Sequence, residues 1–296
     1  MIQDIFPHQF KNEYKANQLV ADTDWLFYFE NNQLLLKTVG EQFFIPRKKD
    51  FPALSCQTAT FLFTLNESSC FLISEKPEAN PAEFDYKDLN FMRTIDQPEV
   101  AWTALAAFQL MNWYKQNKFC GKCGSPLQHK TDERALVCPS CKNMVFPKIS
   151  PAVITAIICG DKILLARNAS FTNNRFALIA GYVDVGETLE QAVRREIKEE
   201  VGLEITKLHY YKSQPWPLSG SLMVGFVAEA DDQHPITIDN KEIVEAGWFA
   251  RGHLPNVPNN TSIAGEMIEK FEKGELSIDT NNTNDQQLRR IELSRN

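Results

Sequence analysis

Four cysteines in the middle of the chain constrain its folding more than any other feature. They form two pairs, Cys120/Cys123 and Cys138/Cys141, with two residues inside each pair and fourteen between the pairs. Each pair fits a tight turn that aims two thiolates inward, and two such turns complete a tetrahedral zinc shell. Because sulfur fills every coordination position, the pattern predicts one structural Zn²⁺ per chain and not a catalytic one. The alternatives are a redox pair or four unrelated buried cysteines.

This cysteine segment divides the 296 residues into two larger parts. Short strand-like runs precede it and lead into a helical apolar pattern at 99–118, whereas strands and a glutamate-rich helix follow it. We therefore predict four segments: a β-rich N-terminal domain ending in a helix (1–117), a zinc ribbon (118–147), a catalytic domain (148–273) and a polar tail that we expect to be mobile (274–296).

Bulk composition excludes several classes of protein. Hydrophobic residues make up 43% and charged residues 23%, which is typical of a soluble globular chain. The apolar run at 152–159 is too short to cross a membrane, and the N-terminus shows no secretion signal, so we expect a cytoplasmic protein with no membrane partner. A net charge of −7 argues against binding long nucleic acid by bulk charge, although a divalent cation can still bridge the protein to a phosphate substrate.

A second segment, 181–203, clusters carboxylates. On a helix, Glu196, Glu199 and Glu200 occupy positions i, i+3 and i+4, so their side chains project from one face and repel one another. A hard divalent cation with oxygen ligands offsets this repulsion, and Mg²⁺ in particular combines a few carboxylates with substrate phosphates. The alternative for three glutamates alone is a solvated surface helix.

The whole segment is more specific than its glutamates. A glycine is followed six positions later by a glutamate, and eight positions after that by the run Arg-Glu-Ile-x-Glu-Glu-x-Gly-Leu. Every one of these positions agrees with the signature of the Nudix hydrolases, so the segment resembles a complete Nudix box. The resemblance implies hydrolysis of a nucleoside diphosphate linked to another group, with Mg²⁺ or Mn²⁺ held by the helix glutamates and an ion pair between the arginine and the first glutamate. The implied catalytic positions are Glu187, Arg195, Glu196, Glu199 and Glu200.

The stretch SQPWP at 213–217, ten residues past the box, is unusual for a strand end. Each proline lacks a backbone donor, so the stretch cannot continue a central strand. The two prolines also restrict the backbone on either side of Trp216, which presents the indole for stacking on a flat ring, worth about 1–3 kcal/mol in comparable sites. Gln214 and Ser221 offer neutral hydrogen bonds to a ligand. The alternative is a tryptophan that packs at a strand edge.

Together with the ribbon and the box, this stretch resembles the NADH pyrophosphatase subgroup, whose signature reads S-Q-P-W-P-F-P-x-S. The first five residues and Ser221 agree, whereas Leu218 and Ser219 replace the phenylalanine and the second proline, which leaves the choice between NADH and NAD⁺ open. The likeness covers roughly residues 90 to 272. It implies hydrolysis of the pyrophosphate of NAD(H) to nicotinamide mononucleotide and AMP, removal of NAD caps from RNA as a further activity, and a homodimer.

The subgroup resemblance implies further site positions. Glu242 matches an additional ligand of the catalytic metal, and Phe146 stands where the subgroup commonly has a tyrosine that packs on substrate. For Arg93 the alignment needs a gap, and a solvated surface cation is the alternative. The implied substrate-binding residues are Gln214, Pro215, Trp216, Pro217, Leu218, Ser219, Gly220, Ser221, Phe146, Ala180, Ala264 and Arg93.

The fold class that these observations predict is α+β. A Nudix α/β/α sandwich would carry the glutamate helix on one face of a mixed sheet and a terminal helix on the other, behind a zinc ribbon and a β-rich N-terminal domain. Three alternative functions stay open: a Nudix hydrolase of ADP-ribose or diadenosine polyphosphates, a non-catalytic nucleotide sensor, and a zinc ribbon that binds nucleic acid.

Overall fold

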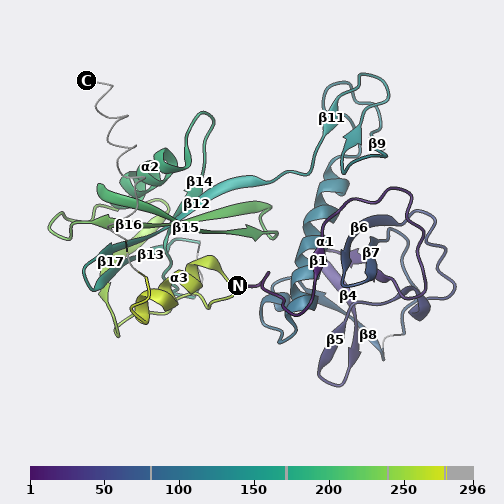
Figure 1. The fold of residues 1–296 in the computed structure, drawn as a ribbon, viewed down its shortest axis with the longest axis horizontal. Coiled ribbons are helices and arrows are strands. Elements are labelled where there is room, and N and C mark those ends of the chain that lie inside the picture. The colour runs from purple at the N-terminus through teal and green to yellow at the C-terminus, as the bar shows by residue number, and fades with distance from the viewer. Residues whose placement is uncertain (81, 171–172, 239, 277, 279–296) are drawn as a thin grey trace. The chain divides into compact units, whose positions relative to one another are not determined.

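The chain folds into two compact units (Figure 1). The computed structural model describes residues 1–80, 82–170, 173–238, 240–276 and 278. The N-terminal unit comprises Ile2–Ile149 and Pro217–Gly220, and the C-terminal unit comprises Met1, Ser150–Trp216 and the chain from Ser221 onward. The predicted tail lies mostly outside the described residues. In the part of the chain that is described, no helix is long and apolar enough to cross a membrane.

Two small sheets and one long helix form most of the N-terminal unit. One sheet has the strand order β1-β6-β7-β2, and in the other β3-β4-β5 pair in order while β8 also pairs with β4. The helix α1 begins at a proline, which has no amide to leave unsatisfied there, and buries most of its first three turns. The elements are β1 (Phe10–Lys11), β2 (Trp25–Phe27), β3 (Phe29–Glu30), β4 (Gln33–Val39), β5 (Gln42–Phe44), η1 (Lys48–Asp50), β6 (Thr60–Leu65), β7 (Ser68–Leu72), β8 (Phe84–Asp88), η2 (Phe91–Arg93) and α1 (Pro98–Gln116).

The cysteine segment belongs to this same unit. It forms a three-stranded antiparallel sheet of β9 (Gln128–His129), β10 (Leu136–Val137) and β11 (Met144–Val145). Side chains join it to the rest of the unit: the Tyr14 hydroxyl donates to the carbonyl of Lys130 at 3.0 Å, and the guanidinium of Arg134 donates to the carbonyl of Leu62. The ribbon is therefore docked on the β-rich domain and packs as part of it.

A mixed sheet forms the centre of the C-terminal unit, with strand order β15-β16-β12-β13-β17 and β14 paired with β12. The strand β12 is parallel to β16 and antiparallel to β13 and β14. Its sequence is rich in β-branched and apolar residues, as expected of a strand buried on both faces. The elements are β12 (Ser150–Cys159), β13 (Lys162–Asn168), β14 (Ile179–Tyr182), α2 (Leu189–Val201), β15 (Ile205–Trp216), β16 (Ser221–Ala230), β17 (Ile243–Ala250) and α3 (Ile263–Glu272).

Helices cover both faces of this sheet (Figure 1). Side chains alternate along β12, so Val153 and Ile157 pack in the cluster that contains the apolar residues of α2. Ile154 and Ile158 pack on the other side, in the cluster that contains α3. The α+β class, with a mixed sheet between the two helices, is confirmed.

The glutamate helix α2 has defined signals at both ends. Thr188 caps its start, because the hydroxyl accepts from the amide of Gln191 at 3.2 Å while the Gln191 side chain accepts from the amide of Thr188 at 2.9 Å. Gly202 ends it in the left-handed region at φ 72°.

The strand β15 runs further than the sequence indicated. It continues through Gln214, Pro215 and Trp216, which pair with Met223, Leu222 and Ser221 of β16. Proline is tolerated because β15 is the edge strand of the sheet, so a missing donor costs no ladder hydrogen bond there. The prolines do exclude a central strand, as predicted, but they do not end this one; the turn is Pro217–Gly220, with Gly220 at φ 66°.

Candidate active site and metal centre

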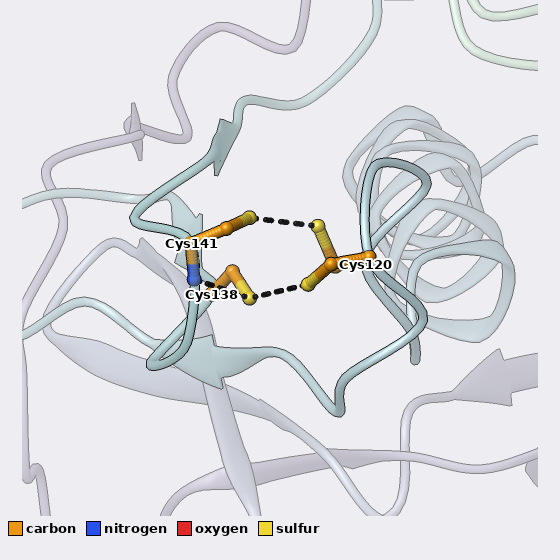
Figure 2. A group of neighbouring side chains, drawn as sticks. Cys120, Cys138 and Cys141 are labelled. Carbon is orange, nitrogen blue, oxygen red and sulfur yellow. Dashed lines mark hydrogen bonds between the residues drawn. The ribbon is translucent and has the colours of Figure 1, made fainter.

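The four predicted zinc ligands converge in the ribbon. Figure 2 shows three of them, Cys120, Cys138 and Cys141, with their side chains pointing toward one another. The Sγ atoms of Cys120 and Cys141 are 3.6 Å apart, those of Cys123 and Cys138 are 3.4 Å apart, and all four lie within 4.8 Å of one another. A tetrahedral ion with Zn–S bonds of about 2.3 Å requires sulfur atoms about 3.8 Å apart. The geometry therefore fits a four-sulfur zinc site.

Backbone turns of the same shape present both cysteine pairs. In each turn the amide of the residue after the second cysteine, Gly124 or Lys142, donates to the carbonyl of the first cysteine, at 2.8 and 3.0 Å. The hydroxyl and the backbone of Ser125 lower the pKa of the Cys123 thiol to about 6. This favours the thiolate, which is the form that binds metal. Since no coordination position is left for water, the site is structural.

Arg195 organises the predicted catalytic carboxylates. Its Nε and Nη2 donate to the two oxygens of Glu187 at 2.6 and 2.9 Å, and its Nη1 donates to Glu196 at 2.7 Å and Glu199 at 3.1 Å. The remaining donation goes to the carbonyl of Tyr182 at 3.0 Å. A guanidinium has five N–H donors, and Arg195 uses all five. The arginine thus holds the loop that precedes α2 against the helix.

The contacts of Glu187 favour its ionised form. The hydrogen bonds from Arg195, with a further one from the amide of Asp184 at 3.0 Å, lower the pKa of Glu187 from 4.5 to about 2. A carboxyl whose pKa falls on folding stabilises the folded state above its ordinary pKa, and this contribution is lost as the pH falls through the folded-state value.

We therefore expect Glu187→Gln to unfold more easily than the wild type at pH 7, with the difference shrinking between pH 4.5 and about 2. Denaturant unfolding of both proteins at several pH values measures this difference. Acid protonates the zinc-binding thiolates in both proteins, so the effect of zinc loss on unfolding cancels when the two are compared. A difference at pH 3 equal to that at pH 7 would contradict the assignment.

Glu196 packs directly on the backbone of β14. A Cβ built on Gly181 would lie 2.0 Å from the carboxyl carbon and 2.0 Å from Oε1 of Glu196, so only glycine leaves room for this carboxylate. Burial raises the pKa of Glu196, while Arg195 opposes that shift. The structure thus shows that Gly181 makes space for a predicted metal ligand.

Gly181→Ala should therefore displace the Glu196 carboxylate by more than 1 Å. We expect about a 10²-fold loss of hydrolytic activity, because misplacing a catalytic group by about 1 Å costs about that much. The stability loss should be small, because the displaced atoms end a flexible side chain. Kinetics and thermal unfolding measure the two effects. Gly247→Ala on β17 is the matched control, since its Cβ would meet only ordinary contacts at 3.6 Å or more; equal activities of the two variants would refute the role of Gly181.

The other predicted metal ligands are Glu199, Glu200 and Glu242. Glu199 is exposed and bound to Arg195. Glu200, the second-last residue of α2, is 7% exposed. Glu242 comes from the chain just before β17. Burial raises the pKa of Glu196 and the charge of Glu242 adds to that shift, while the role of Glu242 as a metal ligand stays a prediction. Among the described residues, the four cysteines alone form a group of three or more such ligands within 4.8 Å. The Nη1 of Arg195 binds both Glu196 and Glu199. Carboxylate oxygens of this kind fit a hard divalent cation.

The residues of the SQPWP stretch and Ser221 differ in burial and in hydrogen-bond partners. Trp216 is half-buried and does not belong to either core cluster of this unit. Gln214 is fully buried, and its amide bonds to the backbone of Thr261 and Ile263. Ser221 is 3% exposed, and its hydroxyl lies 3.2 Å from the hydroxyl of Tyr182.

Tyr182 was not among the predicted site residues. It immediately follows Gly181, its ring is 55% exposed, and it joins the box to Ser221 at the start of β16. The signal that could have found it is its position next to an obligatory glycine of the box. Ala180 and Ala264, the predicted small pocket residues, both pack in the cluster on the α3 face of the sheet.

The remaining predicted substrate residues lie in the N-terminal unit. Phe146 follows β11 and is 50% exposed, and Arg93 ends η2 and is half-buried. The turn Pro217–Gly220, which contains Leu218 and Ser219, also groups with this unit. The substrate roles of these residues stay predictions.

Comparisons with known proteins find similarity along most of the chain. Family models match at residues 149–271 (NUDIX domain), 115–146 (NADH pyrophosphatase zinc ribbon domain) and 23–113 (NADH pyrophosphatase-like rudimentary NUDIX domain). A protein of Citrobacter koseri called NAD-capped RNA hydrolase NudC is 42% identical over 184 residues, which cover 62% of this chain and 71% of that one. Its Salmonella typhi namesake is 41% identical with the same coverage. A solved NUDIX hydrolase from Nitrosomonas europaea has a TM-score of 0.46 at 20% identity, over 55% of this chain and 96% of that one.

The match at 23–113 is one that sequence reasoning missed. No internal repeat was evident, because this region has no glutamate pattern like that of 181–203. The β-rich N-terminal domain is therefore similar to a NUDIX domain without its box.

Proposed function

Because the chain belongs to the Nudix hydrolase family, in the group that carries the NADH pyrophosphatase zinc ribbon, we propose that it hydrolyses the pyrophosphate bond of NAD(H). The products are nicotinamide mononucleotide and AMP. The observation that supports this most strongly is the pair of α2 carboxylates, Glu196 and Glu199, which Arg195 holds while it also binds Glu187 and the end of β14.

The residues divide the work as follows. Glu196, Glu199, Glu200 and Glu242 would hold the catalytic cation, for which Mg²⁺ and Mn²⁺ are the candidates, and it would neutralise the charge that develops on the phosphate oxygens. Water attacks phosphorus in line with the leaving nucleotide, so placing the carboxylates correctly is the main task of the protein. Arg195 performs that task, because it binds two of these carboxylates and the loop at once.

Removal of NAD caps from RNA is a second candidate function. Two relatives at 41–42% identity bear the name NAD-capped RNA hydrolase, and the bond cut in such a cap is the same pyrophosphate. The net charge of −7 does not favour electrostatic binding of a long RNA, so the protein would recognise the NAD cap itself.

We also propose that the protein acts in the cytoplasm as a homodimer. The subgroup resemblance supports a dimer. Outside the zinc site the described cysteines are Cys56, Cys70 and Cys159, and such unpaired thiols suit a reducing compartment. Light scattering after gel filtration measures the mass directly; a mass near 33.8 kDa would exclude the dimer.

Substrate profiling tests the proposed function. The zinc-loaded protein is incubated with Mg²⁺ or Mn²⁺ and, in separate reactions, with NADH, NAD⁺, NAD-capped RNA, ADP-ribose and diadenosine tetraphosphate. We expect the highest kcat/KM on the NAD-containing substrates. If ADP-ribose or diadenosine tetraphosphate were cleaved much faster, the NAD(H) assignment would be wrong and only hydrolysis of diphosphates would stand.

A further inference from the structure

The side-chain amide of Gln214 is buried where β15 meets the start of α3. Its Nε2 donates to the carbonyl of Thr261 at 3.1 Å, and its Oε1 accepts from the amide of Ile263 at 2.7 Å. The side chain is 0% exposed. These two backbone groups flank Ser262, the N-cap of α3, so the amide pairs with them as a neighbouring strand would.

The start of α3 is also held closely from other directions. The Ser262 hydroxyl accepts from the amide of Gly265 at 3.2 Å. A Cβ on Gly265 would lie 1.8 Å from the carbonyl oxygen of Asn259, and a Cβ on Gly225 would lie 2.7 Å from the Ile263 side chain. Backbone therefore touches backbone on one side of the helix start, and the sheet touches it on the other. Because this packing is close, any movement that follows loss of the Gln214 bonds would shift the whole start of α3 together.

Gln214 connects the two elements that carry Trp216 and Ala264, both predicted to form the substrate pocket. Alternate side chains of β15 face α3, since Lys212 binds Glu266 of that helix at 2.8 Å and Gln214 binds its first residue. The same alternation places Trp216 on this face, two residues along the strand. On the helix, Ala264 directly follows Ile263. The side-chain amide of Gln214 thus joins β15, which carries Trp216, to the first turn of α3, which carries Ala264.

We propose that Gln214 is a positioning residue that sets dinucleotide affinity by locking the start of α3 to the strand that ends in Trp216. It does so without touching substrate, because both of its polar atoms bond to backbone inside the unit. This inference rests on the proposed function, and it assigns Gln214 a role other than the direct ligand contact expected from the sequence.

The first test compares three variants in steady-state kinetics. Gln214→Met keeps the shape and removes both bonds, so we expect KM to rise about tenfold while kcat stays within about threefold. Gln214→Glu keeps the acceptor for Ile263 and should recover part of the affinity. Thr206→Val removes a side-chain bond to the Glu229 carbonyl at the far end of β15, and KM should not change. An unchanged KM in Gln214→Met would overturn the proposal, even if thermal stability fell.

A double-mutant cycle separates positioning from direct contact. Ser262→Ala loosens the helix start from its own side, where no substrate contact is assigned. Positioning predicts that Ser262→Ala also raises KM and that the double variant with Gln214→Met is less impaired than the sum of the two. If Gln214 touched substrate directly, Ser262→Ala would leave KM unchanged and the effects would add. That result would overturn the inference.

The wild type in the same assay distinguishes a failure of the function from a failure of this inference. The assay uses whichever dinucleotide of the panel the wild type cleaves fastest, so an error in the NAD(H) assignment alone leaves the test intact. A wild type that cleaves none of them would overturn the proposed function, and this inference with it. An active wild type with an unchanged KM in Gln214→Met overturns the inference alone.

Discussion

Glu199→Gln should lower kcat by about 10³-fold, with little change in the affinity for the dinucleotide. The substitution removes one negative charge from the cation site, and Lewis-acid stabilisation of a phosphoryl transition state is worth several kcal/mol, at about 1.4 kcal/mol for each factor of ten. The side chain is exposed, so folding should be preserved. Single-turnover rates and equilibrium binding, measured on the same preparation, separate the two quantities.

Glu204→Gln provides the matched control for this variant. Glu204 lies just past the same helix, is exposed and pairs only with the exposed Lys198 at 2.9 Å among the contacts described. We expect wild-type kcat from it. If Glu199→Gln turned over like this control while both bound dinucleotide, the carboxylate cluster would not be catalytic. A non-catalytic nucleotide sensor would then be the better account.

Cys138→Ser should release the structural zinc and unfold the ribbon. The folded ribbon has very little core of its own, and structural zinc sites contribute an apparent ~10–16 kcal/mol of binding free energy that is also folding free energy. The thiol is fully buried among its three partners, so serine cannot take over its role. We expect zinc content, measured by atomic emission, to fall from one per chain to near zero, with new protease cleavage within 118–147.

Cys159→Ser is the control for the zinc prediction. This half-buried thiol ends β12 in the C-terminal unit, well apart in sequence from the four ligands. It should keep one zinc per chain and the protease resistance of the wild type. Retention of stoichiometric zinc by Cys138→Ser would show that the four cysteines do not form a single metal site.

The features that could be predicted from the sequence depend on local patterns. The i, i+3, i+4 spacing places three glutamates on one face of α2, because this signal depends on residues within a few positions of one another. The two cysteine pairs are just as local, since each turn is closed by its own backbone.

Features that depend on distant packing could not be predicted. Gly181 is required because Glu196, fifteen residues later, packs on its backbone, and Gln214 is buried because the start of α3 lies against β15. The prolines at 215 and 217 exclude a central strand, but they do not reveal whether an edge strand continues past Gln214, and the strand order decides that. Neither hydrophobic periodicity nor motif spacing contains this long-range information.

Product analysis tests the central claim most directly. NADH is incubated with the zinc-loaded protein and Mg²⁺ or Mn²⁺ in ¹⁸O-labelled water, and the products are identified by mass spectrometry. Attack of water on the pyrophosphate predicts reduced nicotinamide mononucleotide and AMP in equal amounts, with the label in one of the two phosphates. Free nicotinamide with an intact ADP-ribose moiety, or no cleavage at all, would contradict the account.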